Sequence, residues 1–225
     1  KKGGGMIRTQ IPRFRLPEAV IDEEVGYIIN QGVEFKGGHR IESMKGLLAE
    51  PWDAVFVGCG APRGRDLPIP GRDLNGIHFA LEYLQQQNRL LGEHPDGSPE
   101  WGRINAKGKS VIVIGGGDTG SDCVGTALQG ATEVHSFEVM PQPPETRSED
   151  QPWPFWPMKL RTSSSHKEGG DRFWSILTKS FKGYGGRVRS LETVNVEWVR
   201  PTQNGARPRL QETPGTAQTW HADLV

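Results

Sequence analysis

Three glycines, Gly115, Gly117 and Gly120, have the spacing of a dinucleotide-binding loop. They form a G-x-G-x-x-G pattern between a short apolar run at 110–114, which predicts a strand, and a stretch with the character of a helix. The first glycine would make the tight turn, the second would let the main chain approach a pyrophosphate, and the third would let the helix pack closely on the strand. The pyrophosphate would lie at the positive end of the helix dipole. A turn without a ligand would leave the three glycines unexplained, so we predict a dinucleotide site.

Polar residues near this pattern extend the predicted site. Asp118 is a candidate N-cap of the helix, and the hydroxyl of Thr119 is placed to donate to a phosphate oxygen. Glu138 comes 23 positions after Gly115, close to the offset of the acidic residue that binds the adenosine ribose hydroxyls. Its carboxylate would repel a 2′-phosphate, which favours NADH over NADPH. A solvated glutamate at a strand end is the alternative, and Arg147 is a nearby candidate for binding a phosphate instead.

The glycine pattern predicts coenzyme binding, and no catalytic residue is predicted. His166, beside a run of three serines, is interpreted as a hydrogen-bonded structural group rather than a catalytic base.

Apolar periodicity and turn residues predict an α/β chain that positions this loop. The short apolar run at 53–57 predicts a buried strand, and Gly58 and Gly60, which follow it, are further candidate cofactor-binding residues. Residues 62–74, rich in proline, glycine and charge, predict a linker at a domain boundary. The long segment 141–170 carries three aromatic residues, which predicts a packed lid or a partner-facing loop. The other expected elements are helices at 18–30, 43–50, 76–91 and 118–130, and strands at 33–36, 132–140, 171–182, 187–200, 208–213 and 219–225.

Composition restricts the classes of partner. The 225 residues include 27 Lys and Arg against 27 Asp and Glu, and this zero net charge argues against nucleic acid or an anionic membrane as the main partner. Cys59 and Cys123, the two cysteines, do not have metal-ligand spacing and are predicted to be buried free thiols. The sequence contains neither a membrane-spanning apolar run nor a recognisable signal peptide, which favours a reducing compartment. The abrupt ends predict a fragment of a longer chain.

Six segments together resemble the small (β) subunit of glutamate synthase. They are IPRFRLP at 11–17, DAVFVGCGA at 53–61, RDLPIPGRDLNGIHFA at 65–80, GKSVIVIGGGDTGSDCVGTALQGA at 108–131, FEVMPQPPETR with PWPFWP at 137–157, and LRTSSSHKEGG at 160–170. The match covers nearly the whole chain. Flavoproteins of the adrenodoxin-reductase and dihydropyrimidine-dehydrogenase types share the broader architecture and resemble this chain less.

The resemblance implies a Rossmann-like NAD(P)H-binding domain, with three layers formed by a parallel sheet, helices and a β-ribbon, joined to part of an FAD-binding domain. Residues 1–64 would be the partial FAD domain, 65–75 the crossover linker, and 76–225 the NAD(P)H domain. In that family the small subunit passes a hydride from NAD(P)H to FAD, and electrons continue through iron–sulfur clusters to the large (α) subunit. The large subunit makes glutamate from 2-oxoglutarate and glutamine. The resemblance also implies a cytoplasmic location, or a plastid in a plant or alga.

The chain departs from the family pattern in ways that leave a second hypothesis open. The cysteine clusters for iron–sulfur centres, the first FAD glycine pattern and the C-terminal segment that closes over FAD are not in this sequence. The alternative is therefore a non-catalytic module that binds a nucleotide or docks on the large subunit, with 141–170 as its docking surface. Another flavin reductase of the dihydropyrimidine-dehydrogenase group is a further alternative.

Overall fold

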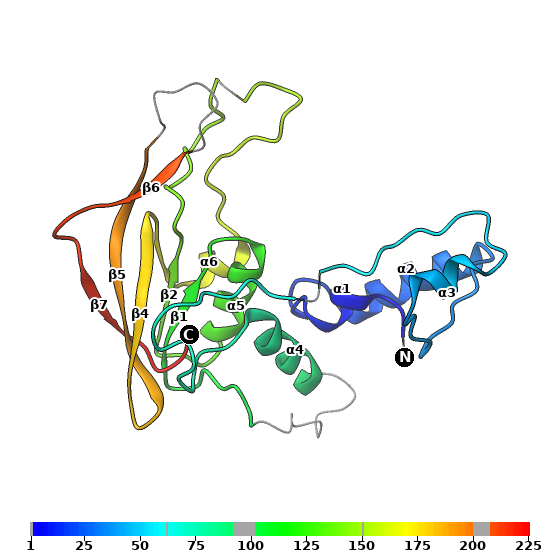
Figure 1. Ribbon diagram of the computed structural model, residues 1–225, viewed down its shortest axis with the longest axis horizontal. Helices are drawn as coiled ribbons and strands as arrows, with labels where there is room; N and C mark the ends of the chain where they lie inside the picture. Colours follow the sequence, from blue (N-terminus) through cyan, green and yellow to red (C-terminus); the bar gives the residue numbers. More distant parts are fainter. Residues whose placement is uncertain (1, 62, 92–101, 150, 200–207) are drawn as a thin grey trace. The chain divides into compact units, whose positions relative to one another are not determined.

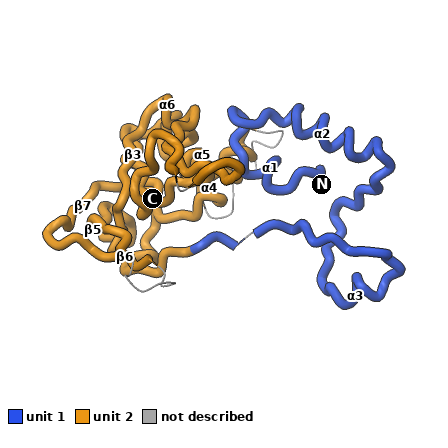
Figure 2. The backbone as a smooth tube through the Cα atoms, turned by 90° about the horizontal axis from the view of Figure 1, so that it is seen from above, with its two compact units in different colours: residues 1–65 blue, residues 66–225 orange. Residues whose placement is uncertain are grey.

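The computed structural model describes residues 2–61, 63–91, 102–149, 151–199 and 208–225. The chain divides into two compact units, Lys1–Arg65 and Asp66–Val225 (Figure 2). This division falls inside the predicted linker at 62–74. The assignment of the two units to FAD and to NAD(P)H stays a prediction.

The first unit is helical in its described part, with α1 (Gly5–Thr9), α2 (Glu18–Asn30) and α3 (Met44–Leu48). The helix predicted at 18–30 is confirmed, and Ser43 caps α3 by accepting a hydrogen bond from the N–H of Gly46 at 3.2 Å. The strands predicted at 33–36 and 53–57 are wrong, because both segments are irregular. A strand needs a neighbouring strand for its main-chain groups, and none lies in the described part of this unit. Phe56 is therefore 96% exposed rather than buried.

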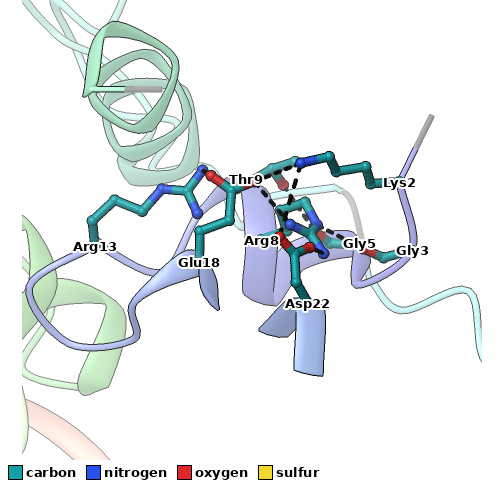
Figure 3. A network of polar contacts seen from close by, with 8 residues as sticks. All are labelled: Lys2, Gly3, Gly5, Arg8, Thr9, Arg13, Glu18 and Asp22. Carbon is teal, nitrogen blue, oxygen red and sulfur yellow. Dashed lines mark hydrogen bonds and ion pairs between the residues drawn. The ribbon is translucent and has the colours of Figure 1, made fainter. Parts of the chain in front are cut away.

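A buried arginine joins the N-terminal stretch and α1 to α2 (Figure 3). The guanidinium of Arg8 donates to Glu18 at 2.8 Å, to Asp22 at 2.7 Å and to the carbonyl oxygen of Gly3 at 2.7 Å. Arg13 pairs with the other oxygen of Glu18 at 3.0 Å. Hydrogen bonds between ionised groups are shorter and stronger than neutral ones. This network holds the first 22 residues together in a unit that has few buried apolar side chains.

The second unit is built on a parallel sheet of β1 (Ser110–Ile114), β2 (Glu133–Phe137) and β3 (Asp171–Phe173), in the order β1-β2-β3 (Figure 1). At the free edge of β1, Leu224 forms a parallel bridge with Val111. The helices α4 (Ala80–Leu91), α5 (Asp118–Leu128) and α6 (Ser164–Glu168) belong to the same unit, where α5 packs on both α4 and α6. The core between helices and sheet contains Tyr83, Leu84, Ala106, Val111, Cys123, Val124, Ala127, Val134 and Leu224.

An antiparallel sheet forms the other layer of this unit. It contains β4 (Ile176–Tyr184), β5 (Arg187–Val199), β6 (Arg209–Glu212) and β7 (Gln218–His221). Because successive strand side chains point to opposite faces, Val111 enters the helix-side core while Ile112 enters the core shared with this second sheet. The rest of that core is Phe137, Ile176, Phe181, Val188, Leu191 and Ala222. The predicted α/β class, with a parallel sheet and a β-ribbon, is confirmed.

Some element boundaries differ from prediction because the chain changes sheets. The strand expected at 171–182 is divided into β3 and β4, and Ser175 between them has a φ of 57°. β3 runs parallel to β2, whereas β4 pairs antiparallel with β5, so the chain must turn between them. The helix expected from residue 76 begins at Ala80. In the preceding segment the carbonyl of Gly76 accepts from the N–H of Val225, and the N–H of His78 donates to the carbonyl of Val225.

The segment predicted as a crossover, 65–75, lies almost wholly in the second unit and packs against the rest of it. Leu67, Ile69 and Leu74 lie on the core between the two sheets. Gly71 has a φ of +81°, and a Cβ there would lie 2.2 Å from the carbonyl oxygen of Phe181. The Phe181 N–H also donates to the carbonyl of Pro70 at 2.8 Å. This crossover segment is therefore fastened to β4 by main-chain contact.

The two cysteines should react very differently. Cys59 is exposed, which contradicts the prediction that it is buried; the buried strand expected just before it, at 53–57, does not form. Cys123 is buried on α5, and burial raises the pKa of its thiol to about 12. At pH 8 we expect a thiol reagent to modify Cys59 at least about 100-fold faster than Cys123, because the thiolate is the reactive form. Mass spectrometry of the labelled peptides measures both rates, and equal rates in the folded protein would contradict this packing of α5.

Candidate functional site

The glycine loop connects β1 directly to α5. Gly115 follows the last residue of β1 and has a φ of +120°, which glycine adopts without strain. Its N–H donates to the carbonyl oxygen of Phe137 at 2.8 Å, so the loop is fastened to the end of β2. Gly117 is the N-cap of α5, with extended backbone angles. The strand–loop–helix context that the spacing predicted is therefore present.

The third glycine is required by close packing, and the second leaves space. A Cβ on Gly120 would lie 2.0 Å from the carbonyl oxygen of Gly115, so α5 can start beside the loop only without a side chain there. A Cβ on Gly117 would meet no described atom within 4 Å. The N–H groups in the first turn of a helix lack intrahelical acceptors, and a glycine N-cap offers them no side chain. The residues present thus fit an anion such as a pyrophosphate.

Asp118 does not cap the helix as predicted. It is the first residue of α5, and the N-cap position belongs to Gly117. Asp118 and Thr119 are both exposed in the first helical turn, beside the open space at Gly117. Their part in binding a coenzyme stays a prediction.

Glu138 comes from the end of β2 and lies against the glycine loop. One carboxylate oxygen accepts a hydrogen bond from the N–H of Gly116 at 2.8 Å, and the other accepts from the N–H of Met140 at 2.9 Å. Glu138, 23 positions after Gly115, is thus in direct contact with Gly116, the next residue of the loop. Arg147, the alternative phosphate ligand, donates to the carbonyls of Gln151 and Phe155 in its own loop at 2.9 and 3.0 Å. The contacts favour Glu138 as the polar group beside the loop.

A chain of hydroxyl groups connects α5 to α6. The hydroxyls of Ser121 and Ser163 are 2.5 Å apart, and Ser163 Oγ is 3.0 Å from Nδ1 of His166. Ser163 is the N-cap of α6 and accepts from the main-chain N–H of His166. His166 thus takes part in a hydrogen-bonded network, which agrees with its structural interpretation. The contact between Ser121 and Ser163 was not predicted from the sequence. The serine run before the short helix is a signal only for the cap at Ser163.

The loop from 141 to 163 exposes a group of apolar side chains. Trp153 is 84% exposed and Trp156 is 76% exposed, and Phe155 and Met158 are also exposed. The guanidinium of Arg161 lies 4.1 Å from the ring centroid of Trp156. Exposed aromatic groups of this size are typical of interaction surfaces.

Gly58 and Gly60, the other predicted site residues, follow an irregular segment of the first unit instead of a strand. Both are exposed, and Gly60 has a φ of +71°. The role of these two glycines stays a prediction.

None of the helices in the described part of the chain is long and apolar enough to cross a bilayer. Nor does that part of the chain contain a cluster of three or more His, Cys, Asp or Glu residues suited to a metal ion.

Comparison with known proteins identifies the family. A model of the pyridine nucleotide-disulphide oxidoreductase family matches residues 12–153. The chain belongs to this family. It is 44% identical over 203 residues to the small chain of glutamate synthase [NADPH] of Mycobacterium tuberculosis, covering 86% of this chain and 40% of that protein. The small chain of glutamate synthase [NADPH] of Bacillus subtilis is 34% identical over 234 residues, covering 100% of this chain and 47% of that protein.

These relatives confirm the resemblance to the small subunit, and they differ in the coenzyme that their names give. Glutamate synthase [NADH] of Schizosaccharomyces pombe is 39% identical over 236 residues, covering 99% of this chain and 11% of that protein. The chain therefore spans less than half the length of these oxidoreductases. Among solved structures, Mycobacterium tuberculosis FprA in complex with NADPH superposes with a TM-score of 0.64 at 16% identity, over 98% of this chain and 60% of FprA. At that identity the similarity shows the fold alone.

Proposed function

We propose that the protein containing this chain is an NAD(P)H-dependent flavoprotein oxidoreductase of the glutamate synthase small-subunit type. The observation that carries this proposal is the open space at Gly117, at the start of α5 and beside the Glu138 carboxylate. A large (α) subunit that forms glutamate from 2-oxoglutarate and glutamine would be its partner. A cytoplasmic or plastid location remains a sequence-based prediction.

The residues of this chain would bind and orient the coenzyme. The pyrophosphate would occupy the space over Gly117 and accept hydrogen bonds from N–H groups in the first turn of α5, where the helix dipole favours negative charge. Gly115, with its positive φ, makes the turn of the loop, and Gly120 lets α5 start close beside it. FAD, bound by the parent protein, would accept the hydride. No side chain of this chain is assigned to a proton-transfer step.

Glu138 supports a choice of NADH over NADPH. Each of its carboxylate oxygens accepts one main-chain hydrogen bond and keeps further acceptor capacity. The vicinal hydroxyls of the adenosine ribose could donate to these two oxygens together. A 2′-phosphate would bring negative charge against the carboxylate and lose affinity.

This choice of coenzyme can be reversed in a single variant. In titrations of the full-length protein we expect NADH to bind at least about 10-fold more tightly than NADPH. That factor is the contribution expected from hydrogen bonds to a charged group. Glu138→Arg should lower the NADH affinity, because the ribose hydroxyls lose their carboxylate acceptor. It should raise the NADPH affinity, because the arginine attracts the 2′-phosphate that the carboxylate repels. Glu145→Arg, in the exposed loop, is the control for the change of charge. An unchanged preference in Glu138→Arg would remove Glu138 from the site.

The exposed aromatic group favours the alternative function, a docking module without turnover. Trp153, Phe155 and Trp156 would then form the surface that contacts the large subunit. The absorbance spectrum of the full-length protein distinguishes the two functions. A yellow protein bleached by NADH or NADPH supports the oxidoreductase, and a colourless protein that binds nucleotide supports the module.

A further inference from the structure

Gly116 occupies a position that the fingerprint leaves open, and its backbone does not require a glycine. It is not among the residues with a positive φ, so an alanine could adopt its main-chain conformation. The turn of the loop is therefore made by Gly115, and another property must explain the middle glycine.

The side chain of Glu138 supplies that property. A Cβ at Gly116 would lie 2.8 Å from Oε2 of Glu138, 3.1 Å from its Cβ and 3.2 Å from its Cγ. The first distance is shorter than a real Cβ contact, and it involves the same oxygen that accepts the Gly116 N–H at 2.8 Å. An alanine would thus push the carboxylate away from the N–H group that holds it.

Three hydrogen bonds hold the main chain at Glu138 and Val139. Its N–H donates to the carbonyl of Phe173 at 2.9 Å, and its carbonyl accepts from Ile176 at 3.0 Å. The indole of Trp198 donates to the adjacent carbonyl of Val139 at 3.2 Å. Because this main chain is fixed in the sheet, the flexible end of the Glu138 side chain would move in response to a new Cβ.

We propose that Gly116 is a positioning residue for coenzyme selection: by lacking a side chain, it holds the Glu138 carboxylate where the adenosine ribose hydroxyls bind. This inference rests on the proposed function. It assigns selectivity to a pair of residues, one in the loop and one at the end of β2, rather than to the acidic residue alone.

A double-mutant cycle tests the coupling between the two residues. Dissociation constants for NADH and for NADPH are measured by calorimetry on the full-length protein, with wild type, Gly116→Ala, Glu138→Ala and the double variant. We expect Gly116→Ala to weaken NADH binding by about 10-fold, because the ribose loses hydrogen bonds to a charged group. NADPH binding should change by less than about 3-fold. In the Glu138→Ala background, the added Gly116→Ala change should cause no further loss, because the carboxylate that it displaces is gone.

Gly130→Ala is the matched control, since a Cβ there would meet its nearest described atom, in Lys107, at 3.4 Å, an ordinary contact. It should leave both dissociation constants unchanged. Equal losses from Gly116→Ala with and without Glu138 would overturn the inference, because they would show a general disturbance of the loop. An unchanged NADH-to-NADPH ratio in Gly116→Ala would also overturn it while leaving the proposed function intact. A wild-type protein that binds neither coenzyme would overturn the proposed function as well.

Discussion

Gly117→Val should weaken the binding of both NADH and NADPH by at least about 100-fold, which corresponds to losing one or two hydrogen bonds to a charged phosphate. The branched side chain would project into the open space at the start of α5, where the structure has no described atom within 4 Å of a Cβ. The extended angles of Gly117 suit a β-branched residue, so the loop should keep its conformation. Calorimetric titration of the full-length protein with each coenzyme measures the effect.

Two comparisons make this result interpretable. Gly117→Ala places one carbon in the same space and should cause a smaller loss of affinity than valine. The unfolding temperature of Gly117→Val should stay within a few degrees of wild type, because a Cβ at this position meets no atom within 4 Å apart from those of its chain neighbours. Wild-type affinity in Gly117→Val would refute the assignment of the pyrophosphate to this loop.

Gly120→Ala should lower the free energy of unfolding by roughly 2–3 kcal/mol, as overpacked sites do. Its Cβ would lie 2.0 Å from the carbonyl oxygen of Gly115, a main-chain atom that can move only if the loop or α5 shifts. For a chain of this size the loss corresponds to a fall of about 5–10 °C in the unfolding temperature. Differential scanning calorimetry measures the fall, and coenzyme affinity should decrease with it because the loop is displaced.

The contrast with Gly117 isolates the cause of this effect. Gly117 faces open space, so its substitution should affect binding alone. Gly120 faces the main chain of Gly115, so its substitution should affect stability and binding together. Gly130→Ala is the control for the loss of a glycine beyond the end of α5, and it should change stability by no more than about 0.5 kcal/mol. An unfolding temperature for Gly120→Ala equal to that of the control would contradict the close packing of α5 on the loop.

The loop itself was predictable because its requirements are local. The run at 110–114, the three glycines and the helix after them are adjacent in sequence, and the turn geometry and helix start depend on neighbouring residues. The helix at 18–30 was predicted correctly for the same reason. The N-cap was misplaced by one residue, because Asp118 and Gly117 both suit that position and the start of the first turn decides between them.

Contacts between distant segments were decided only by the tertiary structure. The apolar run at 53–57 has the composition of a buried strand, but a strand also needs partners, and the described part of its unit supplies none. The spacing of Glu138 suggested proximity to the loop, yet only the pairing of β1 with β2 brings its carboxylate to the N–H of Gly116. The sequence alone determined that a glycine loop joins a strand to a helix, because steric limits on the main chain act over a few residues. Which side chain lies against that loop depended on sheet register, because hydrogen bonding between strands joins residues more than 20 positions apart.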